Sequence, residues 1–397
     1  MKRARPSDAE RSGDTTLGAM ASRDHNPHRR RLYLPILPTE AVADASPGAV
    51  ASPPAVASPG AVASPPAVAS PGAAGAVAIE DHIGASTGCA QVARPREPKP
   101  AWLKVKARTG PNYTELKGLM RGLSLHTVCE EAGCPNIYEC WEDREATFLL
   151  LGDRCTRRCG FCDVRTARPD AVDPSEPERI AQAVEAMGLR FVVLTGVARD
   201  DLPDGGASVW AAAVRAVRRA VPGCGVEVLP TDFRGGKRDI GTVVDARPDV
   251  FAHNLETVRR LHDRIRPAFD YDGSLEALRI VSRLREEQVT KSNLILGMGE
   301  RPEEVIDSLC DLAEAGCDIV TIGQYLQPTQ YHLPVDRWVT PEEFEGHKAD
   351  GEALGITHVE AGPLVRSSYH AGEQFRRALE AGRARVPVSA GNGGAGL

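Results

Sequence analysis

The pattern of hydrophobic residues differs between two parts of the chain. From about Ala146 onward, short runs of apolar and β-branched residues alternate with segments whose apolar residues recur at helical spacing. Two of these segments, Glu178–Met187 and Pro302–Ala315, predict amphipathic helices, and Pro302 is suited to a first helical turn. The runs that predict strands are Ala146–Leu151, Arg190–Thr195, Gly225–Leu229, Asp249–His253, Ser292–Leu296, Asp318–Thr321 and His358–Ala361.

This alternation predicts an α/β fold. Strands that alternate with helices pair in parallel, because a parallel neighbour has to be reached through a long crossover connection. We therefore expect residues 146–362 to form a closed or partial (β/α) barrel of TIM type, with residues 96–145 and 363–397 as extensions that pack on its open face. In such barrels the loops after the strands form the functional face.

The first 95 residues contain few large apolar side chains. Between Ala45 and Val77, the units Ala-Val-Ala-Ser-Pro-Gly and Ala-Val-Ala-Ser-Pro-Pro alternate. Such a composition cannot bury enough apolar surface to offset the entropy of ordering the chain. We predict that residues 1–95 are a disordered, low-complexity extension, and that the chain ends in a flexible tail. A docking role for the extension is an alternative that no residue supports.

Charge and hydropathy narrow the classes of partner. The formal net charge is −6, so the composition gives no support for nucleic-acid binding. No apolar run approaches the length of about 18 residues that a membrane span needs. The basic start of the chain is followed by no apolar region, which argues against a secretory signal. Asp8, Glu10 and Asp14 fit a transit peptide poorly. We expect a cytoplasmic protein that binds neither nucleic acid nor membranes.

The cysteines are concentrated in one region. Of ten, six fall between Cys129 and Cys162, which in a reducing compartment indicates metal or cluster binding rather than disulfides. Cys155, Cys159 and Cys162, here called the first trio, directly follow a predicted strand with the spacing C-x3-C-x2-C. Three thiolates can hold one iron–sulfur cubane and leave one iron open for chemistry. A zinc site or a chance group of buried thiols is the alternative, although no fourth ligand follows nearby.

This spacing, with Phe161 before the last cysteine, resembles the radical S-adenosylmethionine (SAM) superfamily. The resemblance implies a partial barrel of the radical SAM kind and a [4Fe–4S] cluster that binds SAM and splits it to give a 5′-deoxyadenosyl radical. Thr195, Asn254 and Asn293 belong to runs that lie at or just beyond the ends of predicted strands, and they are our candidates for contacts to SAM. Hydrogen bonds made only within the protein are the alternative for each of them.

A second set of cysteines lies upstream. Cys129, Cys134 and Cys140, here called the second trio, have the spacing C-x4-C-x5-C and suggest a second cluster that faces the same cavity. An electron-relay or structural cluster is the alternative. The run Cys-Glu-Glu-Ala-Gly-Cys-Pro-Asn (129–136) and the run Arg-Ser-Ser-Tyr-His-Ala (366–371) resemble the lipoyl synthase family. The resemblance covers about Pro98 to Phe375.

The family resemblance implies a specific reaction. Two sulfur atoms enter at C6 and C8 of an octanoyl chain on a lipoyl-domain lysine, after the adenosyl radical has removed hydrogen from each carbon. The second cluster is the sulfur donor and is consumed. Its fourth ligand would be Ser367, which with Arg366 forms the implied catalytic pair. A serine oxygen is protonated more easily than a thiolate and would leave readily.

The resemblance also implies partners. These are octanoylated lipoyl domains of 2-oxoacid dehydrogenase complexes or the glycine cleavage H protein, a one-electron reductant such as ferredoxin or flavodoxin, and a cluster-repair carrier. Another two-cluster radical SAM enzyme, for sulfur insertion or methylthiolation, is one alternative, and a structural zinc or redox-sensing protein is another.

Some residues depart from the family pattern or fall outside it. The runs Thr-Gly-Val-Ala (195–198) and Leu-Pro-Thr-Asp (229–232) differ from the usual order, which leaves fine contacts open. The remaining cysteines match no ligand motif, so we interpret them as buried or incidental thiols. They are Cys89, Cys224, Cys310 and Cys317. The ten histidines show no metal-ligand pairing.

Overall fold

The computed structural model describes residues 98–104, 110–122, 127–131, 134–142 and 144–385. The predicted extension 1–95 with Cys89, the tail after residue 385, and Ala132 and Gly133 of the cysteine-rich run lie outside the described residues. None of the described helices is long and apolar enough to cross a bilayer.

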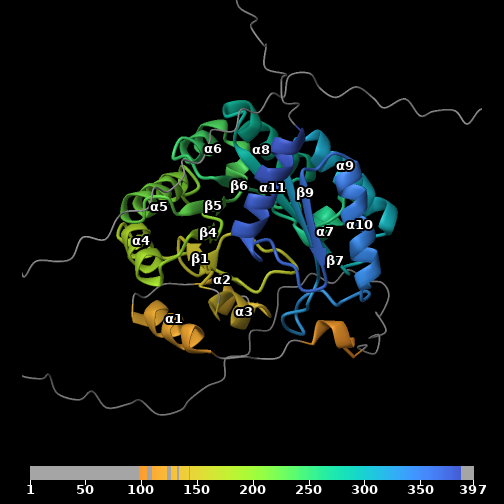
Figure 1. Cartoon of the computed structure of the whole chain (residues 1–397), viewed down its shortest axis with the longest axis horizontal. Helices are drawn as coiled ribbons and strands as arrows, with labels where there is room; N and C mark the ends of the chain where they lie inside the picture. Colours follow the sequence, from red (N-terminus) through yellow and green to blue (C-terminus); the bar gives the residue numbers. More distant parts are fainter. Residues whose placement is uncertain (1–97, 105–109, 123–126, 132–133, 143, 386–397) are drawn as a thin grey trace, which may run out of the picture. The chain divides into compact units, whose positions relative to one another are not determined.

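The centre of the fold is one parallel sheet of seven strands (Figure 1). In spatial order they are β1 (Thr147–Leu150), β4 (Phe191–Gly196), β5 (Gly225–Leu229), β6 (Val250–Ala252), β7 (Val289–Leu296), β8 (Ile319–Gln324) and β9 (His358–Gly362). Each strand pairs in parallel with the next, and no pairing joins β1 to β9 among the described residues. The prediction of a partial (β/α) barrel is confirmed. The short strands β2 (Arg154–Cys155) and β3 (Arg165–Thr166) form a separate ladder that the sequence did not predict.

Helices cover the outer face of the sheet. They are α4 (Glu176–Met187), α5 (Ala207–Ala220), α6 (Lys237–Val244), α7 (His262–Ile265), α8 (Tyr271–Leu284), α9 (Pro302–Glu314) and α10 (Pro341–Ala353), with the 3-10 turns η2 (Phe233–Gly235) and η3 (Arg259–Leu261). Both predicted helices are present, and α4 begins two residues before its predicted start. Gly188 ends α4 with a φ of 60°, a left-handed conformation that glycine adopts without strain.

The predicted start of β7 was too late because the strand begins with polar residues that are buried in the core. β7 begins three residues before the predicted Ser292, because Thr290 and Lys291 are fully buried. The Thr290 hydroxyl donates to the Asp318 carboxylate over 3.0 Å. The Lys291 ammonium lies 3.0 Å from both oxygens of Glu227, across β6. The side chains of Thr290 and Lys291 are therefore both paired, as burial in an apolar core requires.

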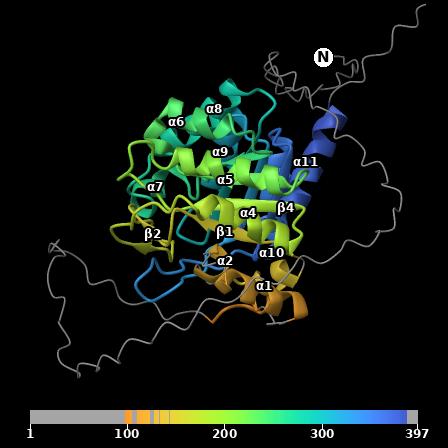
Figure 2. The ribbon, with the colours of Figure 1, turned by 90° about the vertical axis from the view of Figure 1, so that its left-hand side faces the viewer.

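The extensions at both ends pack against the barrel. The N-terminal one contains η1 (Ala101–Leu103), α1 (Pro111–Gly122), α2 (Val128–Glu131) and α3 (Ile137–Glu142), and α2 lies against β1. The C-terminal helix α11 (Ala371–Arg385) contacts both β9 and β4, so it bridges the open side of the barrel (Figures 1 and 2). The rings of Phe191 and Phe375 pack there with centroids 5.8 Å apart.

Candidate active site

A cavity of about 560 Å³ opens at the carboxyl ends of the strands. All three cysteines of the first trio line it, together with Cys129 and Cys134 of the second trio. The other predicted site residues on its wall are Thr195, Asn254, Asn293, Arg366 and Ser367. Cys140 is the one predicted site residue that does not border this cavity. The structure therefore brings two distant stretches of sequence to one space.

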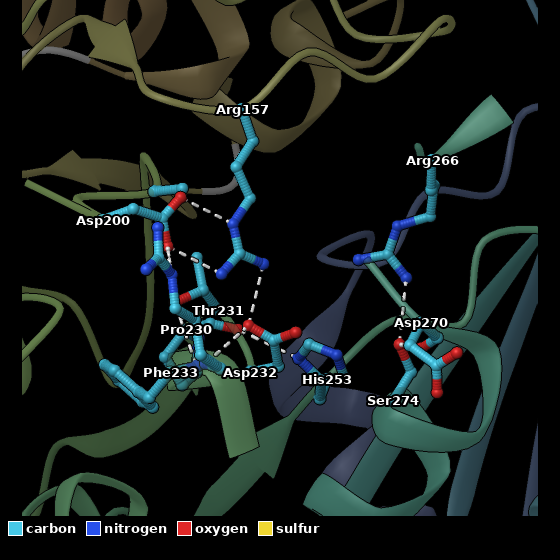
Figure 3. Close-up of polar contacts among 12 residues, drawn as sticks. Arg157, Asp200, Pro230, Thr231, Asp232, Phe233, His253, Arg266, Asp270 and Ser274 are labelled. Atoms are coloured by element: carbon cyan, nitrogen blue, oxygen red, sulfur yellow. Dashed lines mark hydrogen bonds and ion pairs between the residues drawn. The ribbon is translucent and has the colours of Figure 1, made fainter. Parts of the chain in front are cut away.

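The loop of the first trio is fixed to two neighbouring loops by a buried arginine (Figure 3). Arg157, between two of the cysteines, donates to Asp200 after β4 over 2.7 Å and to Asp232 after β5 over 2.8 Å. The hydroxyl of Thr156 donates to Asp200 as well, over 2.9 Å. These hydrogen bonds, that of Arg157 above all, lower the pKa of Asp200 to about 2, so its carboxylate stays charged near neutral pH.

The thiols of the first trio lie in a partly desolvated environment. Burial raises the pKa of Cys159 to about 11 and that of Cys162 to about 12. The Arg266 guanidinium opposes this shift at Cys159. It is held there because the Gly160 amide donates to the Ile265 carbonyl over 2.8 Å. Neutral thiols are thus favoured until a metal group replaces their protons. No motif in the sequence pointed to a role for Arg266.

The second trio surrounds a smaller pocket beside the first cavity. Cys129, Cys134 and Cys140 all line this pocket, whose volume is about 20 Å³. Burial raises the pKa of Cys129 to about 12, and it also raises the pKa of Cys140, with both other thiols of the trio contributing. Because Cys129, Cys134, Arg366 and Ser368 border both spaces, a group held by this trio would extend from the pocket into the cavity.

Hydrogen bonds join the second trio to the C-terminal motif. The Asn136 amide donates to the Leu364 carbonyl over 2.7 Å, across 228 positions of sequence. The Tyr369 hydroxyl donates to the Glu139 carboxylate over 3.4 Å. Arg366 lies close enough to Cys134 to offset part of the rise that burial causes in the pKa of that thiol. These contacts account physically for two motifs that stand far apart in the sequence.

A glycine of β8 makes room for the serine motif. A Cβ atom at Gly323 would lie 2.1 Å from the Val365 carbonyl oxygen, far inside the contact distance. The backbone at Val365 therefore passes directly over Gly323 near the end of β8. This path brings Ser367 to the same cavity wall as Cys129 and Cys134, while Ser368 borders both the cavity and the pocket.

The three candidate SAM contacts differ in how far their side-chain polar atoms are already hydrogen-bonded within the protein. The Asn293 side chain is engaged within the protein, because it donates to Glu256 over 2.9 Å and accepts from Thr321 over 2.8 Å. Asn254 also donates to Glu256, over 2.9 Å, but its Oδ1 is buried and accepts nothing from the described residues. Glu256 accepts a hydrogen bond from each of these amides. Its backbone is in the left-handed region, with φ of 69°. Thr195 has no side-chain hydrogen bond within the described part of the chain.

Further polar atoms on the cavity wall lack partners. Nε2 of His253 and Nε of Arg266 are buried and form no hydrogen bond with the described residues. His253 Nδ1 lies 3.2 Å from the Pro230 carbonyl and so carries the proton, which leaves Nε2 as an acceptor. Burial lowers the pKa of His253 to about 4, so this ring is neutral at pH 7. A polar ligand in the cavity would satisfy these atoms and Asn254 Oδ1.

A single metal ion does not suit either trio. Within the described ranges, no three His, Cys, Asp or Glu side chains converge on one point where an ion could bind. Zinc holds its ligands about 2.0–2.3 Å from one centre, whereas each thiolate of a cubane binds a different iron. The donor set therefore fits an iron–sulfur cluster better than zinc. Cys224, Cys310 and Cys317 border neither the pocket nor the cavity, as predicted.

The bond between Asn136 and Leu364 gives a testable prediction. Asn136→Ala would leave the partly buried Leu364 carbonyl without its donor, at a cost of about 0.5–1.5 kcal/mol, at the junction that carries the second trio. We expect the variant to lose about half of its bound iron to an anaerobic chelator faster than the unaltered protein does. Gln288→Ala, which removes a buried amide before the first residue of β7, is the control. Equal rates for all three proteins would contradict the prediction.

Comparisons with known proteins identify the class. The chain matches the family model of the radical SAM superfamily over residues 149–312. It also matches the model of the N-terminal domain of lipoyl synthase of the radical SAM family over residues 87–134. Among solved structures, methylornithine synthase superposes with a TM-score of 0.44 at 15% identity, covering 68% of this chain and 80% of that one. The family model and the open parallel barrel agree that this is a radical SAM enzyme.

Relatives at high identity specify the family. Lipoyl synthase of Kineococcus radiotolerans is 56% identical over 295 residues, which are 74% of this chain and 88% of that protein. Lipoyl synthase of Mycobacterium ulcerans is 57% identical over 300 residues, or 76% of this chain and 91% of the relative. The chain belongs to the lipoyl synthase family.

Proposed function

We propose that this chain inserts two sulfur atoms into a protein-bound octanoyl group and that each cysteine trio holds one [4Fe–4S] cluster. The observation that carries the proposal is the shared cavity: the first trio, two cysteines of the second trio and Ser367 all line it. A reaction that moves sulfur from one cluster to a carbon activated at the other needs both within reach of one substrate chain.

Each group in the proposal has residues suited to hold it. The first trio would hold the cluster that binds SAM, and together these cofactors supply a one-electron route to unreactive C–H bonds. Asn254 Oδ1 and His253 Nε2, the two unpartnered acceptors, are suited to polar hydrogens of SAM. Asn293 is engaged by Glu256 and Thr321, so we assign it the role of holding Glu256 in place.

The protein's own contribution is placement and exclusion of water. The cavity volume of about 560 Å³ lies within the range of about 300–1,000 Å³ typical of small-molecule sites. Its apolar wall, which includes Leu149, Phe161 and Ile295, suits an aliphatic chain. The network of Arg157 with Asp200 and Asp232 holds the first trio relative to two strand ends and so fixes the distance between the reacting groups.

The second cluster would act as a substrate that supplies sulfur. Three thiolates and the Ser367 oxygen would hold it, and the oxygen is the ligand that protonates most easily. Arg366, half-buried beside Cys134, is a positioning residue for this ligand, because it places a positive charge next to the negatively charged cluster and precedes Ser367 directly.

The proposal extends to partners. The octanoyl group would arrive on a lysine of a lipoyl domain from a 2-oxoacid dehydrogenase complex or of the glycine cleavage H protein. A ferredoxin or flavodoxin would supply electrons, and a carrier protein would rebuild the spent cluster. Nine cysteines are free in the described part of the chain, which suits a reducing compartment such as the cytoplasm.

Replacement of Ser367 tests this function. With an octanoyl-lysine peptide under anaerobic conditions, the unaltered protein should yield dithiolated peptide together with 5′-deoxyadenosine. Ser367→Ala removes the proposed oxygen ligand and should lower dithiolated product at least tenfold while nucleoside still forms. Ser368→Ala removes the neighbouring hydroxyl, which borders both the cavity and the pocket of the second trio, and it should retain product if Ser367 is the ligand.

The masses of the products separate the alternatives. A methylthiolated peptide would support the other two-cluster activity. Nucleoside without any sulfur in the peptide of the unaltered protein would contradict the proposed function and leave the superfamily standing. Equal loss in Ser367→Ala and Ser368→Ala would contradict the role of Ser367.

A further inference from the structure

Exposed positive charges lie on the loop of the first trio, whose cysteines line the cavity. Cys155, Cys159 and Cys162 point into the cavity, whereas Arg158, Arg165 and Arg168 of the same loop are exposed. Lys99, also exposed, borders the cavity from the N-terminal segment. We call Lys99, Arg158, Arg165 and Arg168 the basic rim.

Within the described part of the chain, no acidic side chain neutralises the positive charge of the rim. Of the acidic residues on the loop, Asp170 pairs with Arg154 over 2.8 Å, while Asp163 lies 3.9 Å from the imidazole of His332. No residue of the basic rim forms an ion pair with any other described residue. Since the whole chain carries a net charge of −6, this local surplus opposes the overall balance. Elsewhere some exposed arginines are paired, as Arg219 is with Glu178, while Arg190 and Arg215 form no ion pair with described residues.

An exposed aromatic side chain adjoins the same edge. Tyr331 is 84% exposed and lies in the segment after β8, whose residues 325–328 line the cavity. The segment is tied to the loop of the first trio, because the Leu333 amide donates to the Gly160 carbonyl over 3.2 Å. His332 Nε2 lies 3.0 Å from the Cys162 carbonyl oxygen. Exposed tyrosine and arginine are the residues that most often anchor protein partners.

We infer that the basic rim and Tyr331 form the docking surface for the folded domain that delivers the octanoyl-lysine, and that this domain presents an acidic face. The inference rests on the proposed function, which requires the lysine arm to enter the cavity from the surface. A domain attached to that arm must then cover the mouth, where the unpaired cations are. Charges at the edge of an interface act mainly by speeding association, and salt weakens them.

Charge reversal tests the docking surface. Arg165→Glu/Arg168→Glu reverses two rim charges outside the cysteine trio. With an isolated octanoylated lipoyl domain at low ionic strength, we expect kcat/KM for dithiolation to fall at least tenfold, and the deficit to shrink as salt is added. With a short neutral octanoyl-lysine peptide, which has no face to dock, kcat/KM should equal that of the unaltered protein.

A second double variant controls for net charge. Arg190→Glu/Arg215→Glu reverses two exposed arginines that form no ion pair with described residues, one just before the amino end of β4 and one on α5. It should leave both substrates unaffected. Equal deficits for domain and peptide, a domain deficit in the control, or no deficit in the rim variant would overturn the inference. Failure of the unaltered protein to dithiolate either substrate would instead refute the proposed function.

Discussion

Alanine at Cys155, Cys159 and Cys162 together is expected to abolish cleavage of SAM and to lower the bound iron from about eight to about four atoms per chain, the content of one cubane in place of two. The physical reason is that the second trio has a pocket of its own, beside the cavity that the first trio lines. Removal of the first trio leaves the second, with its pocket and its bond from Asn136 to Leu364, intact. The measurements are anaerobic iron and sulfide analysis after reconstitution and assay of 5′-deoxyadenosine.

A control variant outside the cavity makes this result specific. Cys310→Ala removes a half-buried thiol on α9 that borders neither the cavity nor the pocket. It should keep about eight iron atoms and full nucleoside formation. Retention of the full iron content by the triple variant, or loss of all iron from it, would show that the two trios do not bind independent clusters.

The second large effect is a loss of folding stability, expected when the buried pair of Lys291 and Glu227 is broken. Both side chains are essentially inaccessible, and the ammonium lies 3.0 Å from each carboxylate oxygen. Lys291→Met would leave the Glu227 carboxylate without its partner in the barrel interior. Breaking such a pair costs about 3–5 kcal/mol, because the remaining charge is desolvated and unpaired. We expect the midpoint of anaerobic urea unfolding to fall accordingly.

A double-mutant cycle separates burial from charge. Lys291→Met/Glu227→Leu removes both charges and should recover most of the lost free energy of unfolding, since apolar replacement of a buried pair is often neutral. Arg219→Met breaks an exposed pair with Glu178 and should cost about 0–1 kcal/mol. A Lys291→Met protein as stable as the unaltered one would contradict this account of the core.

The outline of the fold and the positions of the two cysteine trios followed from local patterns. Alternating apolar runs located the seven main strands, and cysteine spacing alone located both trios. These features are predictable because backbone periodicity and cysteine spacing depend only on residues that are close together in the sequence. The polar start of β7 was missed because Thr290 and Lys291 are buried through partners, Asp318 and Glu227, that no local pattern reveals.

Contacts across the sequence were beyond prediction for the same reason. Asn136 stood in a recognised motif, yet its bond to Leu364 depends on how the two extensions pack. Arg266 follows a short helix with no motif around it, and only the fold brings it beside Cys159. The three strand-end candidates reached the cavity as expected, but the structure distinguishes them, since Asn293 is engaged within the protein and Asn254 keeps a free acceptor.

The most direct test of the central claim is the mass spectrum of an octanoyl-lysine carrier after a single anaerobic turnover, with enzyme whose clusters have been rebuilt with heavy sulfide and no free sulfide present. If a cluster in this cavity is spent as the sulfur source, the lipoyl product carries two heavy sulfur atoms. A product whose sulfur is of natural isotopic composition, formed while the bound iron and sulfide stay unchanged, would contradict the account.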